Sequence, residues 1–372
     1  MRARITTFAG LLAIALVATS CGTTKTANAR PVDPVVKIGV VLSLTGVDAP
    51  IGISQRKAIM LADRQFPRTK GARFDPIFVD EAAGAAGVTK LLADGVSAIV
   101  GPTHSSFATS VYSQVDIAQT PMLGLSLTVP GLTAFRPFLW RVSIASDRTI
   151  PPAVTAAARA TGATTAYIIY TSDDLFTVAE REIFTASLSQ DAVSLIGQTS
   201  FLSGQTDLSA VVSDIKAAAP GLICVAAEST DALRILQLLR ANGLDQAIVG
   251  GDGFNSSAIF DTSGPVANNV YVGGAWDANS PSRLSRAFVA DYRKHYGSTP
   301  DSFAAQAYAG MQILRDAIRI GGSTRAGIQD GLGKINGVET VLGAFSFDIS
   351  RDASYAPVIN RIQNGNLTRI SH

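Results

Sequence analysis

The residues best suited to hold a small ligand come directly after short apolar runs that predict β-strands. They are Ser105 and Ser106 after the run at 98–100, Ser126 and Thr128 after the run at 121–125, and Asp252 after the run at 247–249. In open α/β sheets, ligands bind outside the carboxyl ends of the strands, where helix N-termini present free amide groups. The hydroxyls predict a seat for a carboxylate, and Asp252 predicts a partner for an ammonium group. Together they suit a zwitterion.

Each of these residues also has a purely structural interpretation. Ser105 stands where a helix begins, so its hydroxyl could simply cap that helix. Asp252 lies between Gly251 and Gly253 and could be a turn residue. The sequence leaves both alternatives open.

Catalytic and cofactor motifs are scarce. The histidines are His104, His295 and His372, and no ligand-spaced His or Cys cluster predicts a zinc site. No phosphate-binding loop is present. Gly251-Asp252-Gly253 lacks the third glycine of a dinucleotide fingerprint and would set a carboxylate against the pyrophosphate. His104 and Ser105 form a poor base–nucleophile pair, because adjacent residues rarely point at each other and no orienting acid is evident. We expect no enzyme, no metal and no cofactor.

Composition bounds the class of protein. The chain has 372 residues, of which 47% are hydrophobic and 16% charged, which is enough for two domains with ordinary cores. Basic and acidic residues are equal in number once the first twenty residues are set aside. A nucleic-acid partner is therefore not expected, since such proteins carry a basic face. No run after residue 20 is long enough to cross a membrane.

The N-terminus predicts export and anchoring. Residues 1–20 combine Arg2 and Arg4 with an apolar core at 8–18, a pattern typical of a signal peptide and too short for a transmembrane anchor. Cys21 follows small residues and resembles a bacterial lipobox cysteine, although Ala18 stands where leucine is usual. We expect lipidated Cys21 to attach the protein to the cell membrane through a polar tether at 21–34.

The other cysteine, Cys224, lies inside an apolar run at 221–227. We expect it to be a core residue on a buried strand. With Cys21 lipidated, no disulfide within the chain is expected.

Strand and helix patterns alternate from residue 35 onward, which predicts parallel sheets with helices on both faces. Expected strands lie at 35–42, 74–79, 98–100, 121–125, 166–170, 192–198, 222–226, 247–249 and 270–273, with amphipathic stretches between them. The pattern restarts after Pro151-Pro152, so we expect two doubly wound lobes of the α/β class; a single enlarged sheet is the alternative. Helices at 281–296, 302–320 and 326–332 and strands at 344–347 and 356–362 predict that the chain then returns to both lobes through a multi-strand hinge.

The ordered motifs carry a resemblance. They are V-x-I-G-x-x-x-x-x-T-G at 36–46, V-x-A-I-V-G-P at 96–102, Ser105-Ser106, P-M-L at 121–123, G-G-D-G at 250–253 and F-x-F-D-x-x-R-D-A-x-Y-x-P-V-I at 345–359. This set resembles the type I periplasmic binding proteins, in particular the leucine/isoleucine/valine-binding branch that serves ABC importers of branched-chain amino acids.

The resemblance implies roles for individual residues. Ser105 and Thr128 match the positions that hold the ligand carboxylate, and Asp252 matches the second-lobe acid that receives the ammonium group. It also implies a three-strand hinge, with lobe 1 at 35–147 and 278–342 and lobe 2 at 148–277 and 343–372.

The departures from that family concern the ligand. Leu175-Phe176 replaces a Tyr-Gly pair, so Phe176 is expected at the site. Glu228 stands where tyrosine is common, and it is either a second partner for an amine or amide or a solvated loop acid. A different amino acid, a polyamine-like cation, an amide or urea all remain open.

The sequence thus predicts a monomeric, extracytoplasmic receptor that closes around a small polar ligand and hands it to the membrane subunits of an ABC importer. A sensor that uses the same clamp to signal to a membrane partner is the alternative. An exported enzyme is disfavoured by the missing catalytic motifs, and a cytosolic regulator with this fold is disfavoured by the signal peptide.

Overall fold

The computed structural model describes residues 35–66, 73–259 and 264–370. The predicted signal peptide at 1–20, the lipidation site Cys21 and the rest of the tether lie outside these described residues. Within the described ranges, the strands form two main sheets and a small three-stranded one.

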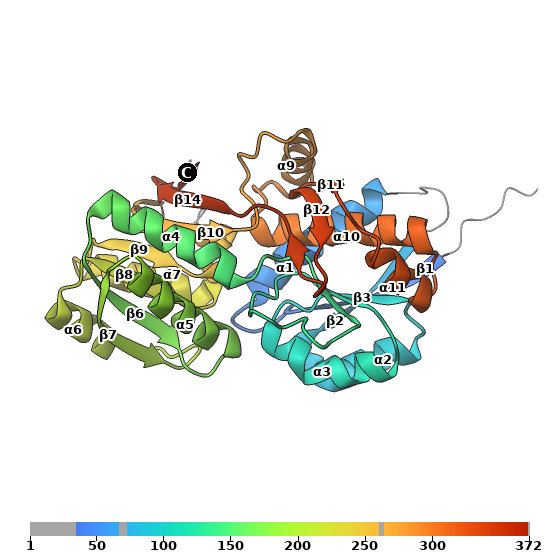
Figure 1. The fold of residues 1–372 in the computed structure, drawn as a ribbon, viewed down its shortest axis with the longest axis horizontal. Coiled ribbons are helices and arrows are strands. Elements are labelled where there is room, and N and C mark those ends of the chain that lie inside the picture. Colours follow the sequence, from blue (N-terminus) through green and yellow to red (C-terminus); the bar gives the residue numbers. More distant parts are fainter. Residues whose placement is uncertain (1–34, 67–72, 260–263, 371–372) are drawn as a thin grey trace, which may run out of the picture. The chain divides into compact units, whose positions relative to one another are not determined.

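The first sheet has five parallel strands in the order β2-β1-β3-β4-β5. Figure 1 labels β1, β2 and β3 of this sheet. Its elements are β1 (Val35–Leu42), α1 (Ala49–Gln65), β2 (Arg73–Asp80), η1 (Glu81–Ala83), α2 (Gly84–Ala93), β3 (Ala98–Val100), α3 (Ser105–Ile117), β4 (Met122–Gly124) and β5 (Leu139–Arg141). Successive strand residues point to opposite faces. Val40 accordingly belongs to one core cluster and Val41 to another, so apolar side chains cover both faces.

The second sheet has seven strands in the order β15-β14-β10-β9-β8-β6-β7. Its elements are α4 (Ser146–Thr161), β6 (Thr165–Thr171), α5 (Leu175–Gln190), β7 (Ser194–Phe201), α6 (Ser209–Ala218), β8 (Leu222–Ala226), α7 (Ser229–Ala241), β9 (Ala247–Gly250), η2 (Asp252–Asn255), η3 (Gly264–Ala267), β10 (Val270–Gly274), β14 (Val358–Gln363) and β15 (Asn366–Arg369). The strands from β7 to β10 are parallel, and β14 and β15 add to this sheet in the antiparallel sense. Two core clusters again cover its two faces.

The C-terminal part of the chain serves both sheets. Its first elements are α9 (Arg283–Tyr296), α10 (Ser302–Gly321), α11 (Arg325–Leu332), β11 (Val338–Thr340), β12 (Gly343–Phe347) and β13 (Ala353–Ser354). Helix α10 packs on α1 and α11, and Phe345 and Tyr355 are part of the first core cluster. The chain passes between the two sheets after β5, after β10 and before β14. The residue boundaries expected for the two lobes stay predictions.

The α/β class with two parallel-sheet lobes is therefore confirmed. The restart expected after Pro151-Pro152 is wrong, because α4 already begins at Ser146 and contains both prolines. Proline lacks a donor but its φ is helical, and the buried stripe of Thr149, Ile150 and Ala153 continues across the pair. The sequence also missed the short strand β5, whose three residues are too few to show a period.

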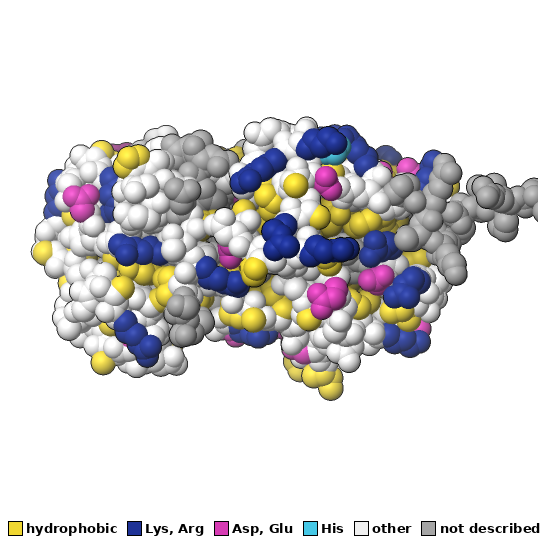
Figure 2. Space-filling model, turned by 90° about the horizontal axis from the view of Figure 1, so that it is seen from above, with side chains coloured by type: hydrophobic (Ala, Val, Ile, Leu, Met, Phe, Trp, Pro, Cys, Tyr) yellow, Lys and Arg dark blue, Asp and Glu magenta, His cyan; other side chains and the backbone are white. Residues whose placement is uncertain are grey.

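Other expectations concern the surface and the core. Cys224 is a free, fully buried thiol on β8, as predicted. On the face in Figure 2, Lys, Arg, Asp and Glu side chains are spread among neutral and apolar ones. Among the described residues, no helix combines the length and the apolar character that a membrane span requires.

Candidate functional site

A pocket lies where the strand ends of the two sheets meet. Its lining comes from both halves of the chain and consists of Ile51, Thr103, His104, Ser105, Ser126, Phe176, Glu228, Asp252 and Phe303. Ser105, Ser126, Phe176, Glu228 and Asp252 were all proposed from the sequence, and the fold brings them together. Their role in binding stays a prediction.

Two other proposed residues are not part of this lining. Ser106 is exposed on α3. Thr128 is buried in the loop after β4, where its backbone carbonyl accepts a hydrogen bond from the N–H of Ser146 at 2.9 Å. The Thr128 hydroxyl makes no hydrogen bond to any described residue. An unpaired buried hydroxyl is costly, so Thr128 stays a candidate that a ligand or a water molecule would satisfy.

The first-lobe wall of the pocket is a network of hydroxyl and amide groups. Thr103 donates its hydroxyl to Gln55 Oε1 at 2.7 Å and accepts from the N–H of Ser43 at 3.1 Å. Ser126 accepts from Gln55 Nε2 at 2.8 Å and donates to the carbonyl of Thr103 at 2.7 Å. These side chains are buried and mutually satisfied, so the wall is fixed without a ligand.

Ser105 differs from its neighbours in this wall. It is the first residue of α3, 2% exposed, and its hydroxyl makes no hydrogen bond within the described chain. The interpretation that Ser105 caps the helix is wrong, because His104 occupies the N-cap position and neither side chain caps. A helix N-terminus with a free hydroxyl beside it suits an anionic group.

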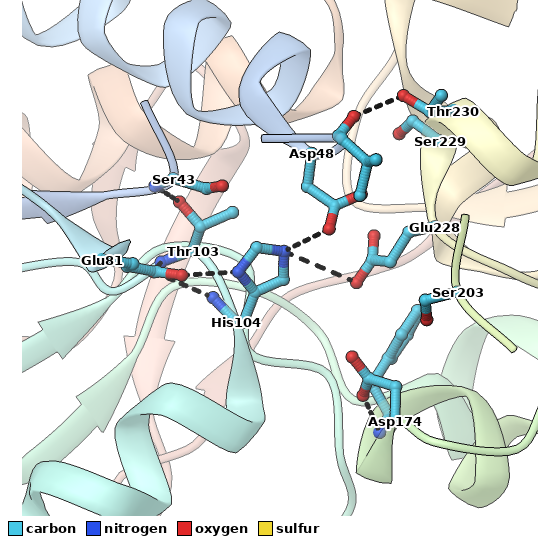
Figure 3. A network of polar contacts seen from close by, with 12 residues as sticks. Ser43, Asp48, Glu81, Thr103, His104, Asp174, Ser203, Glu228, Ser229 and Thr230 are labelled. Carbon is cyan, nitrogen blue, oxygen red and sulfur yellow. Dashed lines mark hydrogen bonds and ion pairs between the residues drawn. The ribbon is translucent and has the colours of Figure 1, made fainter. Parts of the chain in front are cut away.

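His104 is oriented by an acid that the sequence did not reveal. Its Nδ1 lies 2.5 Å from Glu81 Oε2, and Glu81 Oε1 also accepts from the backbone N–H groups of Thr103 and His104 (Figure 3). His104 Nε2 and the Ser105 hydroxyl both lack hydrogen-bond partners among the described residues, so they do not form a base–nucleophile pair. The expectation that no acid orients His104 is therefore wrong.

The charge of His104 is set by its surroundings. Burial lowers the pKa of the imidazole. The hydrogen bond with Glu81 and the charges of Glu228, Glu81 and Asp48 outweigh burial and raise the pKa to about 10. Nε2 lies 3.6 Å from Asp48 Oδ2 and 3.8 Å from Glu228 Oε1. His104 is therefore cationic at neutral pH and faces carboxylates from both halves of the chain.

Asp252 begins η2, directly after β9. Its backbone N–H donates to Glu180 Oε1 at 2.8 Å, and its side chain accepts from Asn255 Nδ2 at 3.0 Å. Burial raises the pKa of Asp252 to about 7, although the Asn255 hydrogen bond opposes this. A Cβ at the preceding Gly251 would lie 1.8 Å from Glu180 Oε2, so a larger residue there would displace the Glu180 carboxyl.

Glu180 supports Asp252 from behind. It is 1% exposed on α5, and its Oε1 also accepts from the Ser146 hydroxyl at 3.2 Å. Burial raises its pKa well above the ordinary value, so folding favours the protonated form of this carboxyl. In its protonated form Glu180 can lie beneath Asp252 without repelling an ionised carboxylate there.

Glu228 occupies the N-cap position of α7, but its side chain does not cap that helix. It turns into the pocket, where burial raises its pKa well above the ordinary value and the charge of His104 opposes this. The interpretation of Glu228 as a solvated loop acid is therefore wrong. Phe176, 6% exposed near the start of α5, supplies an apolar part of the same wall.

Acidic groups dominate the electrostatics of the pocket. No Lys or Arg is among its described lining residues, and the carboxyls nearby are Asp48, Glu81, Asp174, Glu180, Glu228 and Asp252. The strand-end rule could have found Asp48 and Glu81, which follow β1 and β2. Glu180 could not be found in that way, because it lies inside a helix.

Two lobes with parallel sheets and a pocket at their facing strand ends define a bilobal binding protein. The model of the periplasmic binding protein family matches residues 35–356, so the chain belongs to that family. Its members are extracytoplasmic solute-binding proteins and not enzymes.

Individual relatives are distant. A Leu/Ile/Val-binding protein homolog of Brucella melitensis is 21% identical over 338 residues, which are 86% of this chain and 89% of the relative. The structure of a leucine-binding protein from Thermotoga maritima is similar with a TM-score of 0.83 and 22% identity, over 90% of this chain and 98% of that one. A solute-binding protein of Rhodopseudomonas palustris in complex with 3,4-dihydroxybenzoic acid has a TM-score of 0.82 and 20% identity, over 90% and 96%. At these identities the structural likeness shows the fold alone.

Proposed function

We propose that this chain is a lipid-anchored receptor that binds a small solute with an ammonium or amide group and delivers it to an ABC importer. One observation carries the proposal: hydroxyls and the cationic imidazole of His104 line the first-lobe side of the pocket, and the carboxyls of Glu228 and Asp252 line the second-lobe side. An amino acid satisfies both sides, with its carboxylate at Ser105 and the start of α3 and its ammonium group at Asp252 and Glu228.

The acidic wall distinguishes between the ligand types of the relatives. A leucine-type ligand brings a cation to Asp252 and Glu228, whereas an aromatic acid without an amine brings only negative charge. Burying that charge beside two carboxyl groups is unfavourable. The pocket therefore favours an amine or amide, and the apolar area for the rest of the ligand is supplied by Ile51, Phe176 and Phe303.

The mechanism is a clamp. A ligand that contacts both lobes stabilises the closed arrangement by its differential affinity for that state. Lipidation of Cys21 would keep the receptor beside the importer, and membrane fractionation of a Cys21→Ala variant tests that anchor.

A thermal-shift screen followed by calorimetry tests the ligand class. The screen contains amino acids, amides, polyamines and aromatic acids, with a chelator in the buffer. We expect the compound that stabilises the protein to carry an ammonium or amide group. Asp252→Ala should bind that compound more than tenfold more weakly than the wild type. Asp330→Ala, which removes an exposed acid of α11, serves as the control. Binding of aromatic acids alone, or unchanged affinity in Asp252→Ala, would overturn the proposal.

A further inference from the structure

Three helix N-termini meet at the pocket, and none uses its N-cap side chain as a cap. Asp48 precedes α1, His104 precedes α3 and Glu228 precedes α7, and for each the side-chain capping hydrogen bond is missing. The three side chains point toward one another instead (Figure 3). One atom from each, a nitrogen and two carboxylate oxygens, lies within 4.8 Å of the others.

The imidazole is oriented for coordination. Because Glu81 accepts two backbone N–H groups, it is fixed as an acceptor, and His104 donates Nδ1–H to it. A carboxylate on the far nitrogen of a histidine is the usual support of a metal-binding imidazole, since it fixes the ring and its tautomer. The other nitrogen, Nε2, faces Asp48 and Glu228. Since the cationic ring carries a proton on Nε2, a metal ion that binds there displaces this proton to solvent.

The spacing of these atoms is too long for direct hydrogen bonds. His104 Nε2 lies 3.6 Å from Asp48 and 3.8 Å from Glu228, and Nε2 and Asp48 Oδ1 are both buried without a hydrogen-bond partner in the described chain. A tetrahedral zinc ion with bonds of about 2.0–2.2 Å holds its ligand atoms roughly 3.3–3.5 Å apart. The two distances from Nε2 would each shorten by a few tenths of an ångström on metal binding, and the Asp48 and Glu228 oxygens, which lie within 4.8 Å of each other, by up to about 1.5 Å.

We propose that Asp48, His104 and Glu228 form a binding site for a divalent transition-metal ion of the zinc class. One imidazole nitrogen with two carboxylate oxygens suits such an ion better than Mg²⁺ or Ca²⁺, which prefer all-oxygen sites. The three ligands leave a fourth position for water or for the solute. Sequence motifs did not reveal the site, because its ligands come from three distant segments.

The site connects the two lobes. Asp48 and His104 follow strands of the first sheet, and Glu228 follows β8 of the second. A metal ion bound by all three residues would therefore favour the closed arrangement. The metal site shares the pocket of the proposed function, but it does not depend on an amine ligand.

Equilibrium dialysis and calorimetry of the purified, chelator-stripped protein with Zn²⁺ test the site. We expect the wild type to bind one zinc ion per chain. Asp48→Asn and Glu228→Gln should each weaken zinc binding at least tenfold. His295→Gln, which removes an exposed histidine of α9, is the control and should leave the zinc affinity unchanged. Excess Mg²⁺ should not compete. Circular dichroism checks that each variant is folded. No stoichiometric zinc, or equal affinity in Asp48→Asn, Glu228→Gln and the wild type, would overturn the site.

The two proposals fail independently. Asp48→Asn tests only zinc binding, because the Asp48 charge also acts on the lining residues His104 and Glu228; the amine or amide ligand is tested in chelator with Asp252→Ala. Zinc binding without any amine or amide ligand would refute only the proposed function. An amine ligand without stoichiometric zinc would refute only the metal site.

Discussion

The two walls of the pocket are held in place by opposite means. Behind the first-lobe wall, the loop that carries Ser126 is supported by a charged group, since the buried guanidinium of Arg141 donates to the carbonyls of Leu127 and Val129. On the second-lobe wall, the ionisable Asp252 is supported by the buried carboxyl of Glu180, whose pKa burial raises so that its protonated form is favoured. Loss of the Arg141 ion pair should therefore lower the free energy of unfolding. A change of pH should alter the affinity of the second wall's Asp252 for an amine ligand.

The largest effect is expected when the support of the first wall is removed. Arg141 pairs with Asp352 through Nε and Nη2, both at 2.7 Å, and is 0% exposed. Arg141→Ala removes the charged partner of Asp352 and a donor to the carbonyls of Leu127 and Val129, so it should lower the free energy of unfolding by about 3 kcal/mol in urea denaturation. Leu127 and Asp352 keep their hydrogen bonds from Ser143 and Thr133. The control is Arg369→Ala, whose half-exposed arginine lies 4.0 Å from Asp277 and should cost less than about 1 kcal/mol. Equal losses in the two variants would contradict this difference.

The pH dependence of the second wall should be about tenfold in affinity. Because burial raises the pKa of Asp252 to about 7, most of this carboxyl is neutral at pH 6 and ionised at pH 8. Calorimetry in chelator should therefore show an amine ligand binding roughly tenfold more weakly at pH 6 than at pH 8. Asp252→Asn should lose this dependence, and a wild-type affinity that is flat between these pH values would refute the assignment.

Stability without ligand should change in the opposite direction. A carboxyl whose pKa is raised by folding holds a proton that the unfolded chain has released. The free energy of unfolding should thus fall as pH rises from about 4 to about 7. Burial raises the pKa of Glu180 and Glu228 as well, so they act in the same direction. Urea denaturation at several pH values measures the slope.

The smallest effect is expected when single hydroxyls of the first wall are removed, and it should differ between a hydroxyl without a hydrogen-bond partner and one with partners. The Ser105 hydroxyl has no partner among the described residues, so Ser105→Ala should leave the free energy of unfolding within about 0.5 kcal/mol of the wild type and weaken ligand binding about fivefold. Ser126 bonds both Gln55 and Thr103, so Ser126→Ala should cost about 1–2 kcal/mol of unfolding free energy. Unchanged ligand affinity in Ser105→Ala would show that this hydroxyl is not part of the seat.

Most of the fold and part of the pocket could be predicted from local patterns. Buried strands such as β1 and β8 were predicted to the residue, and the strand-end rule brought Ser105, Ser126 and Asp252 to one place. The rule depends only on parallel strands sharing an edge, which the alternation of strands and helices already indicates.

The supporting residues could not be predicted in this way. Arg141 lies on a three-residue strand, and Glu180 lies inside an amphipathic helix where an acid normally predicts a solvent-facing position. The roles of Arg141 and Glu180 follow only from the folded structure, in which Arg141 contacts the loop around Thr128 and Glu180 accepts from the backbone N–H of Asp252. The convergence of Asp48 and Glu228 on His104 likewise depends on how the two lobes meet and on no local spacing.

Trp276 gives the protein an internal optical reporter. Both tryptophans of the chain, Trp140 and Trp276, are buried in the first core cluster. Trp276 follows β10, where the chain leaves the second sheet, and its indole N–H donates to Ser285 at 2.8 Å. A rotation of one lobe against the other would disturb that indole, so unlabelled protein should report solute capture through its own emission.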